Sequence, residues 1–301
     1  MRLLTGVVSI VGVLILSGSS YAAMDSASYQ IEWDTVGNGG SDLAESGSYR
    51  LRDTLGNTAI GNGTSGSYQL RAGYRQGVYD QLVSLQVLAQ SRSSGRAATA
   101  VAGTTVTTNP AGLAIGDYIA LIQDEGAMQV AAVGKVSAVG AGDVTVSGWT
   151  DGGVAPVING VDDYVYELTG STASLGELDP GVVSTAVVMA EVSADLDTGY
   201  VAQVLQDEPL TAGAATISPV GDGTVSAGSE EYGARSSDAS VDDSTFDTAD
   251  TAFLTTYQPV TEKTAGAMND RSFLTLKASI SALTEDGTYQ QTLSYIVSGR
   301  F

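Results

Sequence analysis

The sequence of 301 residues contains no cysteine and no histidine, and it has only six prolines and two tryptophans. Without histidine or cysteine, the chain lacks Ser-His-Asp and Cys-His catalysis and the side chains that zinc and copper sites use most. A chain of this length can bury enough apolar surface to fold without disulfides. The composition therefore argues against an enzyme and against a disulfide-stapled scaffold.

Long apolar runs are scarce, and the one at the start fits the pattern of a secretion signal. A basic Met1-Arg2 precedes an apolar run over 3–16, and Ser20-Tyr21-Ala22 forms a small-x-small cleavage motif. The run is shorter than the ~20 residues that cross a bilayer. We therefore expect residues 1–22 to be a signal peptide. The mature chain is then secreted, extracellular or at the cell surface, with no transmembrane segment. A retained N-terminal anchor is the alternative.

Basic residues are few, and they are unevenly distributed. The chain has 13 Lys and Arg against 34 Asp and Glu, a net charge of −21. The stretch 24–96 is nearly neutral, with six arginines and seven acids, whereas 97–301 carries six basic residues and 27 acids. A field of this sign repels nucleic acid and anionic membranes, so we expect no nucleic-acid partner. It is compatible with a solvated surface, with cation binding or with a basic partner.

Short alternating phrases separated by glycine are abundant, and one of them is repeated. Ser46-Gly47-Ser48-Tyr49-Arg50-Leu51-Arg52 recurs as Ser65-Gly66-Ser67-Tyr68-Gln69-Leu70-Arg71, and Ser26-Ala27-Ser28-Tyr29-Gln30-Ile31 is a fainter copy. Alternation with glycine turns is a strand signature, and long helical patterns are missing. The sequence predicts an all-β protein built from antiparallel β-sandwich and small β-barrel modules.

Changes in composition divide the chain after the signal into four parts. We expect a tyrosine-repeat β-module at 23–90, a polar linker at 91–100, a small β-barrel or sandwich at 101–170, and a β-sandwich at 171–301. Within the last part, 221–250 is glycine-rich and acidic, which predicts a long loop with little regular structure. The end of the chain predicts a hairpin of 274–282 with 293–301, each strand having one buried and one wet face.

Two of these segments resemble known families. The phrase Ser-x-Ser-Tyr-x-Leu-x-x-Thr-x-Gly at 46–56, followed by Ser-x-Ser-Tyr-x-Leu-x-x-Gly-Tyr at 65–74, resembles a segment of exported bacterial surface proteins of unassigned function. The ending Gly-Thr-Tyr-x-x-Thr-Leu-x-Tyr-x-Val at 287–297 resembles the last strand of spore-coat-U-like and WxL-like β-sandwich domains. The resemblance implies export and a sandwich fold. The paired tryptophans of WxL-like domains are missing, which disfavours direct peptidoglycan binding.

Calcium is the one cofactor that the sequence leaves open. Five aspartates fall within 13 residues of the glycine- and serine-rich loop, and hard cations prefer several oxygen ligands. Their spacing differs from the Asp-x-Asp-x-Asp-Gly ladder of helical calcium loops, so a solvated loop is the alternative. The candidate metal ligands are Asp238, Asp242, Asp243, Asp247 and Asp250.

The exposed strand phrases near both ends of the chain are candidates for contact with partners. Tyrosines at strand spacing most often pack across strands or between subunits, and a sugar-binding face is the other interpretation. The candidate partner-binding residues are Tyr49, Arg50, Arg52, Tyr68, Arg71, Arg75, Tyr295 and Phe301.

The function that these patterns favour is non-enzymatic. We expect an extracellular structural protein, a subunit of a surface fibre, coat or appendage that assembles through β-strand contacts with itself or with other surface proteins. An adhesin or carbohydrate-binding surface protein is the alternative. A periplasmic or outer-membrane-associated subunit is a third.

Overall fold

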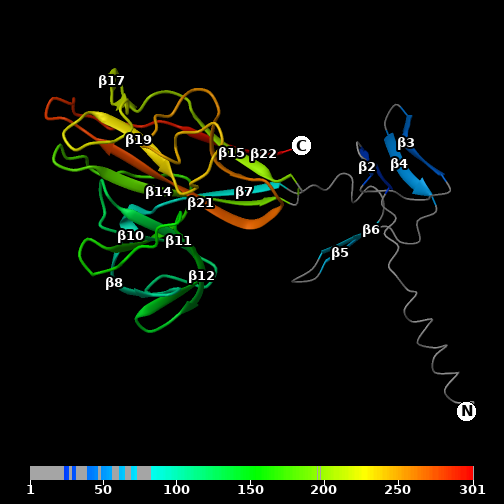
Figure 1. Ribbon diagram of the computed structural model, residues 1–301, viewed down its shortest axis with the longest axis horizontal. Helices are drawn as coiled ribbons and strands as arrows, with labels where there is room; N and C mark the ends of the chain where they lie inside the picture. The colour runs from blue at the N-terminus through cyan, green and yellow to red at the C-terminus, as the bar shows by residue number, and fades with distance from the viewer. Residues whose placement is uncertain are drawn as a thin grey trace, which may run out of the picture. The chain divides into compact units, whose positions relative to one another are not determined.

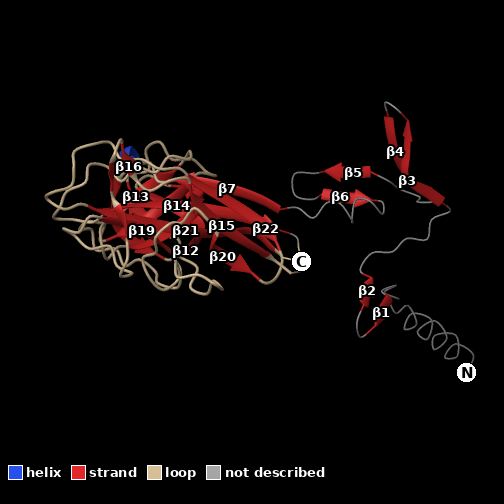
Figure 2. Cartoon of the chain, turned by 90° about the horizontal axis from the view of Figure 1, so that it is seen from above, coloured by secondary structure: helices blue, strands red, loops and turns tan. Residues whose placement is uncertain are grey.

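The structure is a computed structural model with two compact units, Met1–Gln81 and Leu82–Phe301. It describes 83–194, 196 and 198–300 in full and, before them, the backbone of six short strands between residues 24 and 72 (Figures 1 and 2). The expected signal peptide at 1–22 lies outside the described residues, as do Tyr68, Arg75 and Phe301. None of the described residues belongs to a helix long and apolar enough to cross a membrane.

The described strands of the first unit form three antiparallel hairpins, and the second strand of each hairpin contains residues from one copy of the tyrosine phrase. The strands expected at the three phrases are therefore confirmed. A two-stranded sheet is marginally stable by itself in water, and each described hairpin is a separate sheet. The pairs are β1 (Met24–Ser26) with β2 (Tyr29–Ile31), β3 (Gly39–Ser46) with β4 (Tyr49–Leu55), and β5 (Gly61–Thr64) with β6 (Gln69–Ala72).

The second unit contains a closed barrel of six strands in the order β10-β11-β12-β9-β8-β13. Alternating small and branched apolar side chains fill its interior, among them the fully buried Ile119, Val106 and Val165. The small barrel expected for this part of the chain is confirmed. Its strands are β8 (Arg96–Ala102), β9 (Thr105–Thr108), β10 (Tyr118–Gln123), β11 (Val130–Val139), β12 (Asp143–Thr150) and β13 (Tyr164–Leu168).

The same unit contains a β-sandwich of two sheets. The larger sheet has the order β18-β19-β21-β14-β7 and the smaller sheet the order β20-β15-β22. Two short strands, β16 (Thr211–Ala212) and β17 (Ala215–Thr216), form a separate ribbon. The sandwich strands are β7 (Val83–Ala89), β14 (Ser184–Ala194), β15 (Tyr200–Gln206), β18 (Ser218–Pro219), β19 (Glu231–Ser236), β20 (Gln258–Lys263), β21 (Ala267–Ser279) and β22 (Leu293–Gly299).

The barrel is inserted into the sandwich between the neighbouring strands β7 and β14. Where the chain enters and leaves the barrel the two segments pair, since the Ala89 N–H donates to the Gly170 carbonyl and the Thr169 N–H donates to Ala89. Residues 83–89 therefore belong to the sandwich, and assigning them to the first module was wrong. The expected linker at 91–100 is also wrong, because it holds the 3₁₀ turn Arg92–Ser94 and most of β8.

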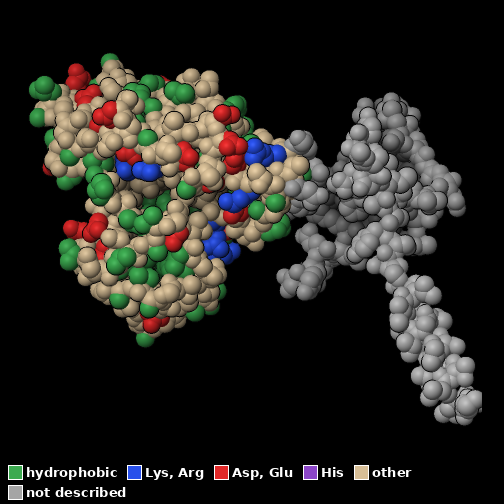
Figure 3. All heavy atoms as spheres, viewed as in Figure 1, with side chains coloured by type: hydrophobic (Ala, Val, Ile, Leu, Met, Phe, Trp, Pro, Cys, Tyr) green, Lys and Arg blue, Asp and Glu red, His purple; other side chains and the backbone are tan. Residues whose placement is uncertain are grey.

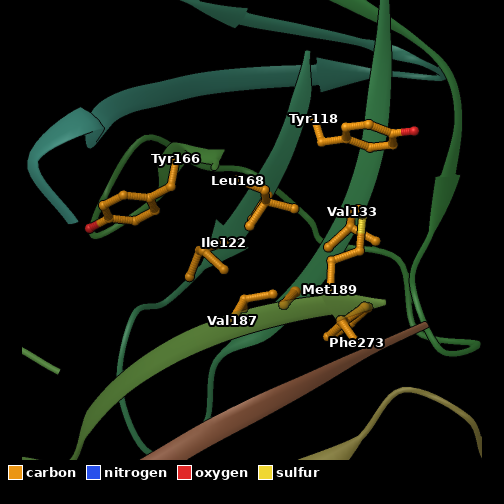
Figure 4. Packing of buried hydrophobic residues seen from close by; sticks show 10 residues of the cluster. Tyr118, Ile122, Val133, Tyr166, Leu168, Val187, Met189 and Phe273 are labelled. Atoms are coloured by element: carbon orange, nitrogen blue, oxygen red, sulfur yellow. The ribbon is translucent and has the colours of Figure 1, made fainter. Parts of the chain in front are cut away.

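An apolar interface joins the barrel to the outer face of the larger sheet (Figure 4). Barrel side chains from β10, β11 and β13 pack on Val187 and Met189 of β14 and on Phe273 of β21. Met189 is fully buried there. Because this interface removes apolar side chains of both the barrel and the sandwich from water, we expect the two to move as one body.

A charged group lies beside this apolar interface. Glu191 of β14 accepts a hydrogen bond of 2.8 Å from the Tyr118 hydroxyl of the barrel, and its other carboxylate oxygen lies 3.2 Å from Nε of Arg271. Lys135 of β11 stands over the Tyr118 ring at 4.9 Å. These contacts give the barrel one defined orientation on the sheet.

The terminal hairpin expected from the sequence is wrong. β21 lies in the larger sheet between β14 and β19, whereas β22 pairs with β15 in the smaller sheet. The barrel covers part of the β21 face that alternation predicts to be wet, so Phe273 and Thr275 are buried there, opposite the core-facing Leu274. The alternation along β22 is confirmed, with Ile296 and its serine neighbours outside.

The acidic segment 221–250 has little regular structure apart from one strand, as expected, but it is anchored in the sandwich rather than being an excursion from it. It contributes β19 to the larger sheet, and Phe246 packs against Phe253 in the sandwich core with ring centroids 5.6 Å apart. Val225 and Val241 are buried as well. Scattered apolar residues therefore anchor a segment whose average composition is polar.

Candidate functional site

The five aspartates of the acidic segment do not come together. Among the described residues, the structure contains no group of three or more acidic side chains placed to hold a metal ion. Oδ2 of Asp238 accepts hydrogen bonds from the Thr261 hydroxyl at 2.8 Å and from the Glu262 N–H at 3.1 Å. Asp250 is buried against Lys277, with 2.9 Å between Oδ1 and Nζ. The possible calcium site is thus not assembled in the described residues.

The other three aspartates are also separate. The Asp242 side chain is 82% exposed, with a carboxylate oxygen 4.0 Å from an Arg300 nitrogen. Asp243 occupies a turn with a positive φ of 55°. Asp247 is only partly exposed.

We expect calcium to leave the thermal stability of this chain unchanged, since no three acidic side chains of the described residues converge and the carboxylates of Asp238 and Asp250 already have protein donors. The measurement is the melting temperature in a calcium series and in excess chelator, with magnesium as the matched ion. A rise in melting temperature with calcium alone would contradict the geometry.

The residues expected to bind partners fall into three groups. Tyr49, Arg50 and Arg52 are on β4 and Arg71 is on β6, each on the second strand of a hairpin. Tyr68, Arg75 and Phe301 are outside the described residues. The Tyr295 ring packs into the core between the two sheets, which corrects its expected role as an outward-facing contact.

One lateral side of the sandwich is open. The edge strands β7 and β22 lie next to each other there, one from each sheet (Figures 1 and 2). Within the described residues no strand pairs with the outer edge of β22. The core-facing side chains of both strands are only partly covered, among them Leu85 and Val297.

Neither strand carries the features that usually protect a sheet edge. Natural edges are blocked by charges, by proline, by bulges or by short strands. β7 reads Val-Ser-Leu-Gln-Val-Leu-Ala and β22 reads Leu-Ser-Tyr-Ile-Val-Ser-Gly, with no charge and no proline. In a chain with a net charge of −21, two uncharged edges on one side are a distinctive feature.

The opposite edges of the same sheets are protected. β18 is two residues long and ends in Pro219. β20 contains Pro259, Glu262 and Lys263, and its register with β15 shifts after Ala202. The contrast within one molecule identifies the β7–β22 side, which we call the open side, as the candidate assembly surface.

Sequence reasoning missed the open side because it placed β7 in another module and β22 in a hairpin. A usable signal was present. Both strand runs lack Asp, Glu, Lys, Arg and Pro over seven residues, whereas the longer strands β14 and β21 contain charged residues. The central strand β15 is uncharged as well.

Most basic side chains of the described residues lie within 4.0 Å of a carboxylate. On the face drawn in Figure 3, basic side chains lie in small groups beside acidic ones. Arg96 pairs with Glu167, and Arg300 approaches Glu262 to 3.3 Å near the end of β22.

Among the titratable groups of the described residues, buried tyrosines have the largest shifts in pKa. Burial raises the pKa of Tyr118, Tyr166, Tyr200 and Tyr295 above the ordinary value. The first three also donate their phenolic hydrogen to a carboxylate, which raises the pKa further. The hydroxyl of Tyr295 is buried and has no hydrogen-bond partner in the described part of the chain.

We expect Tyr295→Phe to leave the free energy of unfolding unchanged or to raise it by up to about 1 kcal/mol, because a buried hydroxyl without a partner is destabilising. Denaturant unfolding at pH 7 measures this. A small cavity of about 10 Å³, lined in part by Ser236 and Ser272, adjoins the ring. A loss of more than ~1 kcal/mol would show that the hydroxyl binds a water molecule in that cavity.

Comparison of the chain with protein-family models, with curated proteins and with solved structures gave no match. The open side and the hairpins are therefore the features that bear on function.

Proposed function

We propose that this protein is a non-enzymatic structural protein of the cell exterior, a subunit of a fibre, coat or appendage that assembles through β-strand contacts. The observation that carries the proposal is the open side, where β7 and β22 offer two uncharged, unprotected edges. A sheet edge of this kind accepts another strand through main-chain hydrogen bonds.

The hairpins of the first unit support the same function. Each is a two-stranded sheet, and such sheets gain stability when a third strand is added. Their strands therefore supply a second set of contacts, with Tyr49, Arg50, Arg52 and Arg71 on the strands that would meet a neighbouring subunit. The leader-like segment at 1–22 supports export.

The test is self-association of the purified chain from residue 23 onward. We expect concentration-dependent assembly in sedimentation velocity and ordered particles by negative-stain microscopy. Replacing the exposed Ser84 and Ser294 by lysine puts a charge on each open edge and should reduce assembly. Ser147→Lys makes the same change on the barrel strand β12 and should assemble like the wild type.

A chain that remains monomeric up to its solubility limit would overturn the proposal. Equal assembly of the Ser84→Lys/Ser294→Lys variant and the wild type would show that assembly does not use the open side.

A further inference from the structure

We propose that β22 pairs antiparallel with β22 of a second copy, about a two-fold axis that passes through Ile296. The proposal rests on the proposed function and names its first interface. The occupant of the β22 edge is then an identical chain, and the smaller sheets of two copies become one continuous sheet of six strands.

The backbone of β22 is suited to this pairing. In an antiparallel ladder, residues alternate between bonding to one neighbour and facing the other side. The Arg300 N–H donates to Gly199 and the Asp207 N–H donates to Thr292, so the even-numbered residues of β22 bond to β15. The odd-numbered residues therefore direct their N–H and C=O groups to the open edge. These residues are Leu293, Tyr295, Val297 and Gly299.

A register centred on Ile296 pairs the whole strand. Tyr295 and Val297 then exchange hydrogen bonds with Val297 and Tyr295 of the second copy, and Leu293 does the same with Gly299. Ile296 faces its own copy in a pair without hydrogen bonds, where Cα atoms approach to about 4.5 Å. A register that is off-centre by one residue would leave one end of the strand without its bonds.

The cross-strand neighbours in this register are compatible. Ser294 meets Ser298 of the second copy, and the bulky Leu293 meets Gly299. On the outer face Ile296 is 39% exposed in the single chain, and it becomes covered by its own copy. No pair brings like charges together, which would oppose association.

The charge distribution permits a second copy of the chain to approach at this edge. With a net charge of −21, two copies repel each other over most of their surface. The outward-facing residues of β15 and β22, among them Val201, Gln203 and Leu205, carry no charge. This face and its edge are therefore a region where two acidic chains can approach closely.

The adjacent edge strand β7 is compatible with the same symmetry. A two-fold axis along the sheet normal brings β7 towards its own copy as well, because β7 lies next to β22. Thr169 and Gly170 cap the Ala89 end of β7, which leaves Val83, Leu85 and Val87 for this second contact.

The decisive experiment uses the absence of cysteine. In Ile296→Cys the new thiol is the only one in the chain, and a pair without hydrogen bonds places two Cα atoms within the range that a disulfide spans. We expect mild oxidation of dilute protein to give a disulfide-linked dimer on a non-reducing gel. Val157→Cys, in a barrel loop at a site that is 70% exposed, is the matched control and should stay monomeric.

A second variant measures the strength of the interface. Ile296→Glu places two carboxylates opposite each other and should raise the dissociation constant by on the order of tenfold or more. Val157→Glu should leave it unchanged. Circular dichroism of each variant checks the fold.

Hydrogen exchange of the unmodified chain provides a readout without substitution. The amides of Tyr295 and Val297 should become slower to exchange as concentration rises, while that of Glu262 on the protected edge should not.

The outcomes separate this inference from the proposed function. If Ile296→Cys cross-links no faster than Val157→Cys, or if exchange at Tyr295 is independent of concentration, the two-fold pairing is wrong. If wild-type particles still form in that case, the proposed function stands and uses other strands. If the wild type does not assemble at all, both fail.

Discussion

Replacing Lys277 by methionine is expected to lower the free energy of unfolding by about 3 to 5 kcal/mol. Nζ of Lys277 lies 2.9 Å and 3.1 Å from the two carboxylate oxygens of Asp250 and donates to the Ala127 carbonyl of the barrel at 3.2 Å. The side chains are 12% and 4% exposed. Methionine fills similar volume but leaves the buried carboxylate without its cation. Denaturant unfolding at pH 7 gives the difference.

Two matched variants test the cause. Asp250→Asn added to Lys277→Met removes the buried charge and should recover part of the loss. Lys263→Met makes the same substitution in the more exposed pair with Asp270, where the side chains are 43% and 25% exposed, and should cost at most about 1 kcal/mol. If Lys277→Met lowers the free energy of unfolding by no more than Lys263→Met does, the buried pair is not a stabilising element.

The same pair shows why the acidic segment was misread from the sequence. Composition reports how many carboxylates a stretch contains, but their partners come from distant strands. Lys277 reaches Asp250 across 27 positions, and Thr261 reaches Asp238 across 23. No local pattern marks either contact. Phe246 and Val241 were the available signs that the segment is anchored, because isolated apolar residues in a polar run are often buried.

Local alternation gave the strands but not their neighbours. β22 (Leu293–Gly299) lies within the expected range 293–301, because period-two patterns depend on the strand alone. The pairing of β7 with β14 joins Leu85 to Val192 across the whole barrel. Such an insertion leaves no periodic trace in the sequence, so module boundaries drawn from composition fell inside the sheet.

The open side depends on these non-local pairings. Whether a strand lies at an edge is a property of the sheet, and the uncharged runs of β7 and β22 become informative only when both are known to be last in their sheets. A buried central strand also has an uncharged, largely apolar sequence, so the sequence alone does not distinguish the two.

The fold is expected to lose stability steeply above pH 10. Buried tyrosines keep their protons in the folded state because their pKa values are raised, whereas an unfolded tyrosine ionises near 10. The stabilisation from a raised pKa is complete below the unfolded value and disappears as pH rises towards the folded one. The groups with the largest shifts are Tyr166, Tyr200 and Tyr295.

For each such tyrosine, the free energy of unfolding falls by about 1.4 kcal/mol for every pH unit above 10. After allowance for screening by solvent near Tyr166 and Tyr200, we expect the three together to lower the free energy of unfolding by about 2 to 4 kcal/mol at pH 11. Denaturant unfolding from pH 8 to 12, followed together with tyrosinate absorbance, measures both the loss and the protons released.

Tyr295→Phe provides the matched control for this titration. It removes one of the three groups while the Tyr166 and Tyr200 hydroxyls keep their carboxylate acceptors, Glu125 and Asp270. Its stability should therefore fall less steeply above pH 10 than that of the wild type, with equal slopes below pH 9. Equal slopes over the whole range would mean that the Tyr295 hydroxyl reaches solvent and that its pKa is not raised by burial.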